Sequence, residues 1–299
     1  MQIEPIEAVL PPILQSAVVW HYTSPARAAS IITGRAFWAT SITGLNDTSE
    51  MLFGMDLLKS VWKDRRKTSD NLHQIDQWIS VAELQLHGQR RSDSYVLCAS
   101  TESDSIQQWD RYGYCVLGVS TTEVMTKQPR LEGDGRRLAP TFTTGWREVI
   151  YDEHDQLEHI DRLLDVLEEL ARVGIGNPGD GIQAAESDGV ECVLRSIVYL
   201  KPGAFASEAE VRLYGQAIPT GALVQEHMGA FGPSKHILVR ARGAIDANDD
   251  LPIVCVRIGN IMPSVPSETI ALKAILDKLH SPIPITAVET PFRKSRQAR

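Results

Sequence analysis

Short apolar runs alternate with amphipathic segments along the chain, in an irregular order. Runs rich in β-branched and aromatic residues, bounded by turn residues, predict β-strands. Such runs lie at residues 17–20, 36–41, 95–100, 114–120, 146–151, 209–215, 236–242, 252–259 and 285–289. The order of strands and helices shows no regular βαβ period and no internal repeat. The pattern therefore favours an α+β fold over a doubly wound sheet.

Apolar residues at helical spacing predict helices between these strands. They lie at residues 25–32, 105–112, 155–173, 189–199 and 267–280, and in two segments of a helical insertion within residues 48–90. Ser24 before Pro25 predicts an N-cap, and Gly34 predicts the end of that helix. We expect one domain over residues 1–292, with a second helical insertion near 153–199 and a basic tail at 293–299.

Charge and cysteine content narrow the class of protein. A net charge of −8 argues against a generally basic nucleic-acid-binding surface. The four cysteines are far apart and have no zinc-ligand spacing, so we expect reduced, buried thiols and no metal. The N-terminus lacks a signal-peptide pattern, and no apolar run is long enough to span a membrane. We therefore expect a cytoplasmic protein with no membrane partner.

Three polar clusters interrupt the ends of predicted strands. They are His21-Tyr22-Thr23-Ser24, Asn46-Asp47 with Glu50, and Glu208-Ala209-Glu210-Val211-Arg212. The first lies where a strand is expected to meet a helix, whose unpaired N–H groups can bind an anion or a polar ligand. Histidine and tyrosine also commonly end core strands with one face buried. We expect the three clusters to meet in one cleft.

The third cluster carries the most chemical information. In a strand, residues two apart point to the same face, so Glu208, Glu210 and Arg212 would line up. This arrangement is either an ion-pair ladder on the surface or the polar floor of a cleft. In a cleft, Arg212 would keep one carboxylate ionised and leave the other to stabilise a developing cation or to take a proton.

Two aromatic residues on the short helix at 105–112 offer a further candidate. Trp109 and Tyr112 are three residues apart, so both rings can face one direction, either as core packing or toward a ligand. The chain contains no G-x-G-x-x-G, no P-loop and no serine nucleophile elbow. Rossmann, kinase and α/β-hydrolase folds are therefore poor candidates.

Taken together, these blocks resemble a bacterial family called domain of unknown function 2971. The matching blocks are "WHYTS", "IITGRAFWATSITGLNDTSEM", "YVLCASTESDSIQQWDRYGYCVLGVS", "LKPGAFASEAEVRLYG" and the closing "VRIGNIMPSVPSETIALKAILDKLHSPIPITAVETPFR". Each block is weak alone, but their order over nearly the whole chain is specific. The chain departs from the family where Thr48 replaces a usual proline and Gln108 a common methionine, and where the turn after Tyr112 is shortened.

The layout also resembles the ADP-ribosyltransferase fold, a split and mostly antiparallel sheet around an NAD-binding cleft. That resemblance implies Glu210 as the carboxylate that stabilises an oxocarbenium-like ribose, and Glu208 as the group that orients or deprotonates the acceptor. It also implies that His21 acts at the ribose. The implied NAD-contacting residues are His21, Tyr22, Thr23, Trp38, Ser41, Asn46, Asp47, Trp109, Tyr112 and Arg212.

The resemblance therefore implies an NAD-dependent ADP-ribosyltransferase-like enzyme, with NAD as substrate, no metal, and a role as a toxin or phage-defence effector. The acceptor, protein or nucleic acid, is not assigned. The alternative is a noncatalytic module that senses or binds a nucleotide-type small molecule in the same cleft. A different hydrolytic or nucleic-acid-modifying activity is the third possibility. Convergence of His21 and Glu210 within one nucleotide's width would favour the enzyme.

Overall fold

A computed structural model gives the fold and describes most of the chain. The described residues are 7, 9–44, 48–69, 72–88, 94–122, 125–127, 145–175, 182–216, 224–229, 232–241, 251–259, 266–278 and 283–288. Asn46 and Asp47, the polar stretch at 131–144 and the basic tail at 293–299 lie outside these ranges. No helix within them has the length and apolar character that crossing a membrane requires.

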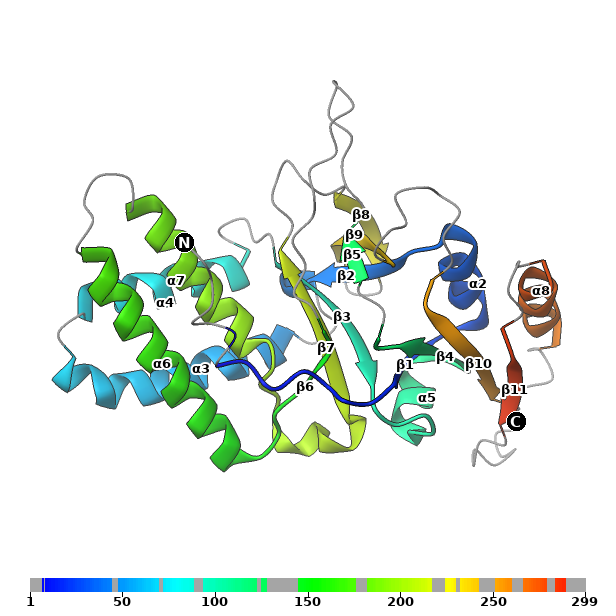
Figure 1. Ribbon diagram of the computed structural model, residues 1–299, viewed down its shortest axis with the longest axis horizontal. Helices are drawn as coiled ribbons and strands as arrows, with labels where there is room; N and C mark the ends of the chain where they lie inside the picture. The colour runs from blue at the N-terminus through cyan, green and yellow to red at the C-terminus, as the bar shows by residue number, and fades with distance from the viewer. Residues whose placement is uncertain are drawn as a thin grey trace, which may run out of the picture.

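The eleven strands of the described residues form one sheet (Figure 1). They are β1 (Val18–Thr23), β2 (Phe37–Ser41), β3 (Ser94–Ser100), β4 (Cys115–Ser120), β5 (Met125–Lys127), β6 (Arg147–Glu148), β7 (Glu210–Gln216), β8 (Val224–Gly229), β9 (Gly232–Ala241), β10 (Ile253–Gly259) and β11 (Ile285–Val288). The order is β11-β10-β4-β1-β3-β2-β9-β5, while β7 pairs with β3 and β6, and β8 pairs with β9. Because β10 and β11 are the one parallel pair of these strands, the predicted α+β class with a mostly antiparallel sheet is confirmed.

One edge of β3 is shared between two strands, and this leaves a gap in the pairing. β7 runs along the other edge of β3, from Ser94 to Ser100. On the shared edge, β2 pairs with β3 at Tyr95 and Val96, whereas β1 pairs at Ser100 alone. Between these points β1 and β2 separate from β3. A backbone carbonyl at such a gap needs another hydrogen-bond donor.

Most of the helices lie at the two ends of the sheet, and one short helix packs against β1 between them (Figure 1). Those of the described residues are α2 (Pro25–Gly34), α3 (Thr48–Arg65), α4 (Leu72–Leu86), α5 (Ile106–Tyr112), α6 (Glu153–Ile175), α7 (Ile182–Ile197) and α8 (Pro266–Leu276). α3, α4, α6 and α7, which derive from the two predicted helical insertions, pack together at one end, and α2 and α8 lie at the other. We call the four packed helices the helical layer.

The helical layer has its own apolar core, which reaches the sheet at Val96 and Tyr214. On α6 the core residues are Ile160, Leu163, Leu164, Leu167 and Ala171, all at 0% exposure, as the helical spacing predicts. α7 crosses α4 closely at Gly189, where a Cβ atom would lie 2.1 Å from the Trp78 ring. A second core joins α2 and α8 to the opposite face of the sheet.

Several element boundaries differ from the predicted ones. The predicted cap of α2 is confirmed, since Ser24 accepts a hydrogen bond from the Arg27 backbone N–H. The helix ends differently, because Arg35 rather than Gly34 adopts the left-handed conformation, with φ 49°. Of the strand predicted at 146–151, β6 covers two residues, and α7 begins at Ile182 rather than 189. The strands β5 and β8 were not predicted; β8 forms a hairpin with β9.

Candidate functional site

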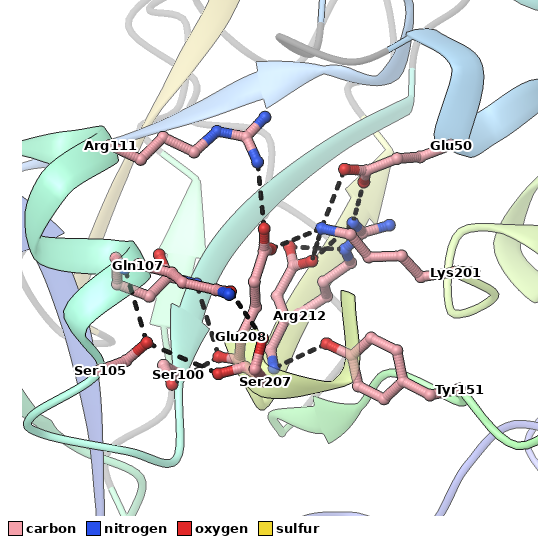
Figure 2. A network of polar contacts seen from close by, with 12 residues as sticks. Glu50, Ser100, Ser105, Gln107, Arg111, Tyr151, Lys201, Ser207, Glu208 and Arg212 are labelled. Atoms are coloured by element: carbon pink, nitrogen blue, oxygen red, sulfur yellow. Dashed lines mark hydrogen bonds and ion pairs between the residues drawn. The ribbon is translucent and has the colours of Figure 1, made fainter. Parts of the chain in front are cut away.

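A buried ion cluster lies between the sheet and the helical layer. Glu50 comes from α3, Lys201 follows α7, Glu208 ends the 3-10 helix η3 (Gly203–Glu208), and Glu210 and Arg212 belong to β7. The Lys201 Nζ atom lies 2.8 Å from Glu50, 2.6 Å from Glu208 and 3.0 Å from Glu210 (Figure 2). We call these five residues the Glu210 cluster.

Arg212 connects two carboxylates of the Glu210 cluster through its guanidinium group. Its Nε donates to Glu210 Oε1 at 2.8 Å, and one terminal nitrogen contacts Glu210 Oε2 at 2.8 Å and Glu50 at 2.7 Å. The other terminal nitrogen donates to the carbonyl oxygen of Val198. Every nitrogen of this guanidinium therefore has an acceptor. Both oxygens of Glu210 are also occupied, since Oε2 accepts from Lys201 as well.

Burial settles what kind of ion pair this is. The exposed fraction is 1% for Arg212, 7% for Glu210 and 5% for Glu208. The alternative of an ion-pair ladder on the protein surface is therefore wrong. Burial alone would raise the pKa of Glu210, but Arg212 and Lys201 outweigh it and lower that pKa to about 2. Pairing with Arg212 thus favours the ionised form of Glu210, which is the direction expected from the sequence.

The strand geometry expected for Glu208 is wrong, although its carboxylate does reach the cluster. β7 begins at Glu210, and Ala209 before it adopts a left-handed conformation with φ 44°. The chain therefore turns between the two carboxylates. One Glu208 oxygen accepts from Lys201, and the other accepts from Arg111 of α5 at 3.0 Å.

Arg111 connects the Glu210 cluster to α5, as Figure 2 shows. α5 is fixed to η3 by hydrogen bonds from Ser207 Oγ to Gln107 and from Gln108 to the Glu208 carbonyl. The Arg111 guanidinium also lies 5.6 Å from the centre of the Tyr112 ring. Burial raises the pKa of Tyr112, and the charges of Glu210 and Glu208 raise it further. The Tyr112 hydroxyl thus lies within electrostatic reach of the buried carboxylates.

Around α5, three partly exposed rings pack against one small apolar cluster, and two of these rings each lie beside a guanidinium group. We call this set of residues the aromatic–guanidinium surface. Its residues are Trp20, Arg111, Tyr112, Tyr114 and Arg257. The Arg257 guanidinium lies 5.4 Å from the centre of the Trp20 ring and 3.2 Å from the Asp104 carboxylate, whose side chain is 56% exposed. Aromatic rings beside guanidinium groups can stack on a planar ligand and bind an anionic one.

Two predicted site residues, Trp109 and Tyr22, are buried beneath the rings of this surface. Trp109 is 1% exposed and packs edge-on against Tyr22, with ring centres 5.4 Å apart. The Tyr22 hydroxyl donates to the Glu102 carbonyl and accepts from the Ser105 N–H, and burial raises its pKa to about 12. Trp109 and Tyr22 are therefore core residues under the rings.

The strand registers place His21 and Glu210 on opposite faces of the sheet. Directly paired residues share a face, and successive residues alternate between faces. Trp20 pairs with Ser100, and Ser100 pairs with Glu210, so these three side chains share one face. His21 follows Trp20 and packs on the other face, edge-on against Phe37 at 5.4 Å. The prediction that His21 and Glu210 line the same cleft is therefore wrong.

His21 instead fills the gap between β1 and β3. Its Nδ1 lies 2.9 Å from the carbonyl oxygen of Cys98, and a carbonyl can only accept, so Nδ1 carries the donated proton. Burial lowers the pKa of His21 and favours the neutral ring. His21 thus donates to a backbone acceptor at the gap between β1 and β3.

The remaining predicted ligands do not join the aromatic–guanidinium surface. Thr23 and Ser41 are buried on the same face as His21, opposite the Glu210 cluster. Trp38 is 48% exposed and stacks on His236 of β9, with ring centres 4.1 Å apart. Asn46 and Asp47 lie outside the described residues.

Comparisons with known proteins add nothing to this picture. Neither family models, nor curated proteins, nor solved structures match the chain. The assignment of a function therefore rests on the geometry and on the sequence blocks.

Sequence reasoning missed Lys201 in the Glu210 cluster, and it missed Trp20, Arg111, Tyr114 and Arg257 on the aromatic–guanidinium surface. Glu50 belongs to the second polar cluster of the sequence, and it does meet the third cluster through its contact with Arg212. No periodicity marks an isolated basic residue such as Lys201 as buried, because burial arises here from contacts between segments distant in sequence. In the described ranges, no group of three or more His, Cys, Asp or Glu side chains is arranged to hold a metal ion.

Proposed function

We propose that the protein binds a nucleotide-type ligand on the aromatic–guanidinium surface. The observation that carries this proposal is the placement of partly exposed rings, Trp20, Tyr112 and Tyr114, beside the guanidinium groups of Arg111 and Arg257. Rings of this kind stack on a base or on nicotinamide, and guanidinium groups bind phosphate oxygens. Asp104, which now pairs with Arg257, is exposed enough for a phosphate to replace it.

The resemblance to domain of unknown function 2971 and to the ADP-ribosyltransferase fold makes NAD the nucleotide that we propose first. The gap between β1 and β3 supports this proposal, because a split sheet is the feature expected of that fold. Fold resemblance alone does not establish an activity. The site chemistry must therefore decide between binding and transfer.

The Glu210 cluster favours a sensing or binding module over a transferase. Glu210 is 7% exposed, and three cationic contacts occupy its two oxygens. With a pKa of about 2 it cannot take up a proton near neutral pH. Its charge is already balanced by Lys201 and Arg212, which leaves little of it for a cationic transition state.

ADP-ribosyl transfer is our second candidate, and one observation favours it. Glu208 contacts Arg111, and Arg111 contacts the Tyr112 ring, so a carboxylate is continuous with the aromatic–guanidinium surface. Stabilisation of an oxocarbenium-like ribose requires an ionised carboxylate and not a base. If NAD is cleaved, Glu208 is the side chain that we expect to act, with Glu210 holding the cations behind it.

Calorimetric titration with NAD, ADP-ribose and AMP tests the binding proposal. Trp20→Ala and Arg257→Ala should each weaken binding about tenfold or more, since stacking on one ring contributes roughly 1–3 kcal/mol. Trp38→Ala is the matched control, because this exposed tryptophan lies on β2 outside the surface, and it should leave the affinity unchanged. Absence of binding of all three nucleotides to the wild type would overturn the proposal.

A parallel assay of nicotinamide release separates the two candidates. We expect the wild type to bind NAD without releasing nicotinamide. Release that is lost in Glu208→Gln but retained in Trp38→Ala would instead establish the transferase or glycohydrolase chemistry. Melting temperatures of each variant exclude loss of activity through unfolding.

A further inference from the structure

A second arginine cluster lies beside the Glu210 cluster, since Arg147 of β6 pairs with Arg212 of β7, but it has no part in the proposed function. Arg147 of β6 and Arg195 of α7 both contact the carboxylate of Glu7. Arg147 lies 2.5 Å from Glu7 Oε2, and Arg195 contacts Oε1. The arginine side chains are 4% and 8% exposed, whereas that of Glu7 is 46% exposed. The two buried cations thus converge on a carboxylate that solvent reaches.

The N-terminal segment brings Glu7 to this position. In Figure 1 the dark blue segment runs from the helical layer past β6 to β1. Arg147 donates to the carbonyl oxygen of Pro11 and is bridged to Ile13, while the Leu14 N–H donates to the Trp146 carbonyl. The two arginines therefore belong to β6 and α7, and the N-terminal segment that carries Glu7 lies across them.

Several donors in this cluster lack an acceptor. Within the described part of the chain, the Nε atoms of Arg147 and Arg195 and the hydroxyl of Tyr199 have no hydrogen-bond partner. Tyr199 is 0% exposed. Burial raises the pKa of its hydroxyl to about 12, while the charges of Arg147, Arg195 and neighbouring Arg212 lower this pKa and that of Glu7 raises it. Since an unsatisfied buried donor is costly, such a group needs an explanation.

The mismatch between donors and acceptors indicates the chemistry of the missing partner. A carboxylate presents two oxygens, and Glu7 uses both on the terminal nitrogens of the two arginines. A phosphoryl group presents three strong acceptor oxygens and up to two negative charges. Guanidinium groups bind such oxygens in paired, charge-assisted hydrogen bonds. A phosphoryl group can therefore satisfy donors that a carboxylate leaves unpaired.

We propose that Arg147, Arg195 and Tyr199 form a binding site for a phosphoryl group, and that the Glu7 carboxylate occupies this site as a displaceable internal anion. The ligand is inorganic phosphate or the phosphate of a phosphomonoester. Binding exchanges one anion for another, so Glu7 sets the affinity by competition. Release of Glu7 from the arginines also couples the site to the N-terminal segment.

Calorimetry with the full chain in chloride buffer tests this site. Inorganic phosphate and glycerol phosphate are titrated separately, so that the two sources of the phosphoryl group are distinguished. Glu7→Gln removes the competing charge and should bind phosphate at least about tenfold more tightly than the wild type, as expected for one charge-assisted hydrogen-bond set. Glu148→Gln is the control, because this exposed residue neighbours Arg147 on β6 and should change nothing.

Melting temperatures supply a second readout that a purely structural Glu7 would not give. Glu7→Gln should melt lower in chloride, because two buried arginines lose their shared carboxylate, and phosphate should restore the melting temperature. Equal phosphate affinity in wild type and Glu7→Gln, or destabilisation of Glu7→Gln that phosphate does not reverse, would overturn the proposal.

Discussion

The two arginine clusters differ in how completely their donors are satisfied. In the Glu210 cluster, every nitrogen of Arg212 has an acceptor, and both oxygens of Glu210 are occupied. In the cluster around Glu7, two Nε atoms and the Tyr199 hydroxyl have no partner in the described part of the chain. Both sets of arginines are buried, so burial alone does not distinguish them.

This difference separates a structural role from a binding role. A buried ion cluster that is fully paired holds elements in place, because removal of any member leaves an uncompensated charge. The Glu210 cluster links α3 through Glu50 to β7 through Arg212, and so joins the helical layer to the sheet. A cluster with unsatisfied donors has capacity for a further acceptor. We therefore interpret the Glu210 cluster as a structural connection between the helical layer and the sheet, which we call the interlock. The cluster around Glu7 we interpret as a ligand-binding site.

Breaking the interlock should have the largest effect on stability. Arg212→Ala leaves Glu50 and Glu210 buried without their main cation, and we expect a loss of about 3–5 kcal/mol in the free energy of unfolding. Chemical denaturation at neutral pH measures this loss.

Arg172→Ala serves as the matched control, because this exposed arginine pairs with Glu169 on the surface of α6 and its loss should not be measurable. A loss of less than about 1 kcal/mol in Arg212→Ala would mean that the cluster behaves like a surface ion pair.

Glu210→Gln should have the next largest effect, and its signature is a pH dependence. The folded pKa of Glu210, about 2, lies below its ordinary value of 4.5. Its contribution is therefore fully present above about pH 4.5 and is lost as the pH falls toward 2. A shift of this size corresponds to about 3 kcal/mol at neutral pH.

Unfolding free energies at neutral pH and near pH 3 test this assignment. Glu210→Gln should lower the neutral value and flatten the decline toward acid, because the substituted side chain does not titrate. Glu148→Gln should keep the wild-type pH profile, since that carboxylate is exposed. Parallel profiles of the wild type and Glu210→Gln would show that the ion pairs do not stabilise the folded carboxylate.

Local sequence patterns could predict most of the elements but not all of their limits. The apolar spacing of α6 and the Ser24-Pro25 cap of α2 are local signals, and both predictions were confirmed. β5 has three residues and β6 two, too few for a period to be visible. The left-handed residue that ends α2 was also missed, because arginine adopts this conformation less readily than the neighbouring Gly34.

The candidate site was predictable only in part, for a physical reason. Alternation within β7 correctly grouped Glu210 with Arg212, since that relation depends on one strand. The side of the sheet on which His21 lies depends instead on the registers between β1, β3 and β7, which follow from long-range pairing. Lys201 enters the Glu210 cluster through the turn between α7 and η3, and no local period marks it.

The smallest expected effects come from two buried tyrosines whose hydroxyls differ in their hydrogen-bond partners. The Tyr214 hydroxyl lies 2.8 Å from Ser94 and donates to Glu191 at 2.9 Å, whereas the Tyr199 hydroxyl has no partner in the described part of the chain. Tyr214→Phe should therefore cost about 1–2 kcal/mol of unfolding free energy. Tyr199→Phe should cost nothing measurable in chloride, because no hydrogen bond is lost.

Phosphate binding by the two tyrosine variants tests whether the cluster around Glu7 is a binding site and the Glu210 cluster is not. Tyr199→Phe should weaken phosphate binding severalfold in the Glu7→Gln background, since it removes a donor that we assign to the ligand. Tyr214→Phe should leave that affinity unchanged, because its hydroxyl is already satisfied within the protein. Equal destabilisation of the two variants in chloride would mean that Tyr199 already has an internal acceptor. The donors around Glu7 would then be as fully satisfied as those of the Glu210 cluster, and they would not need a phosphoryl group as acceptor.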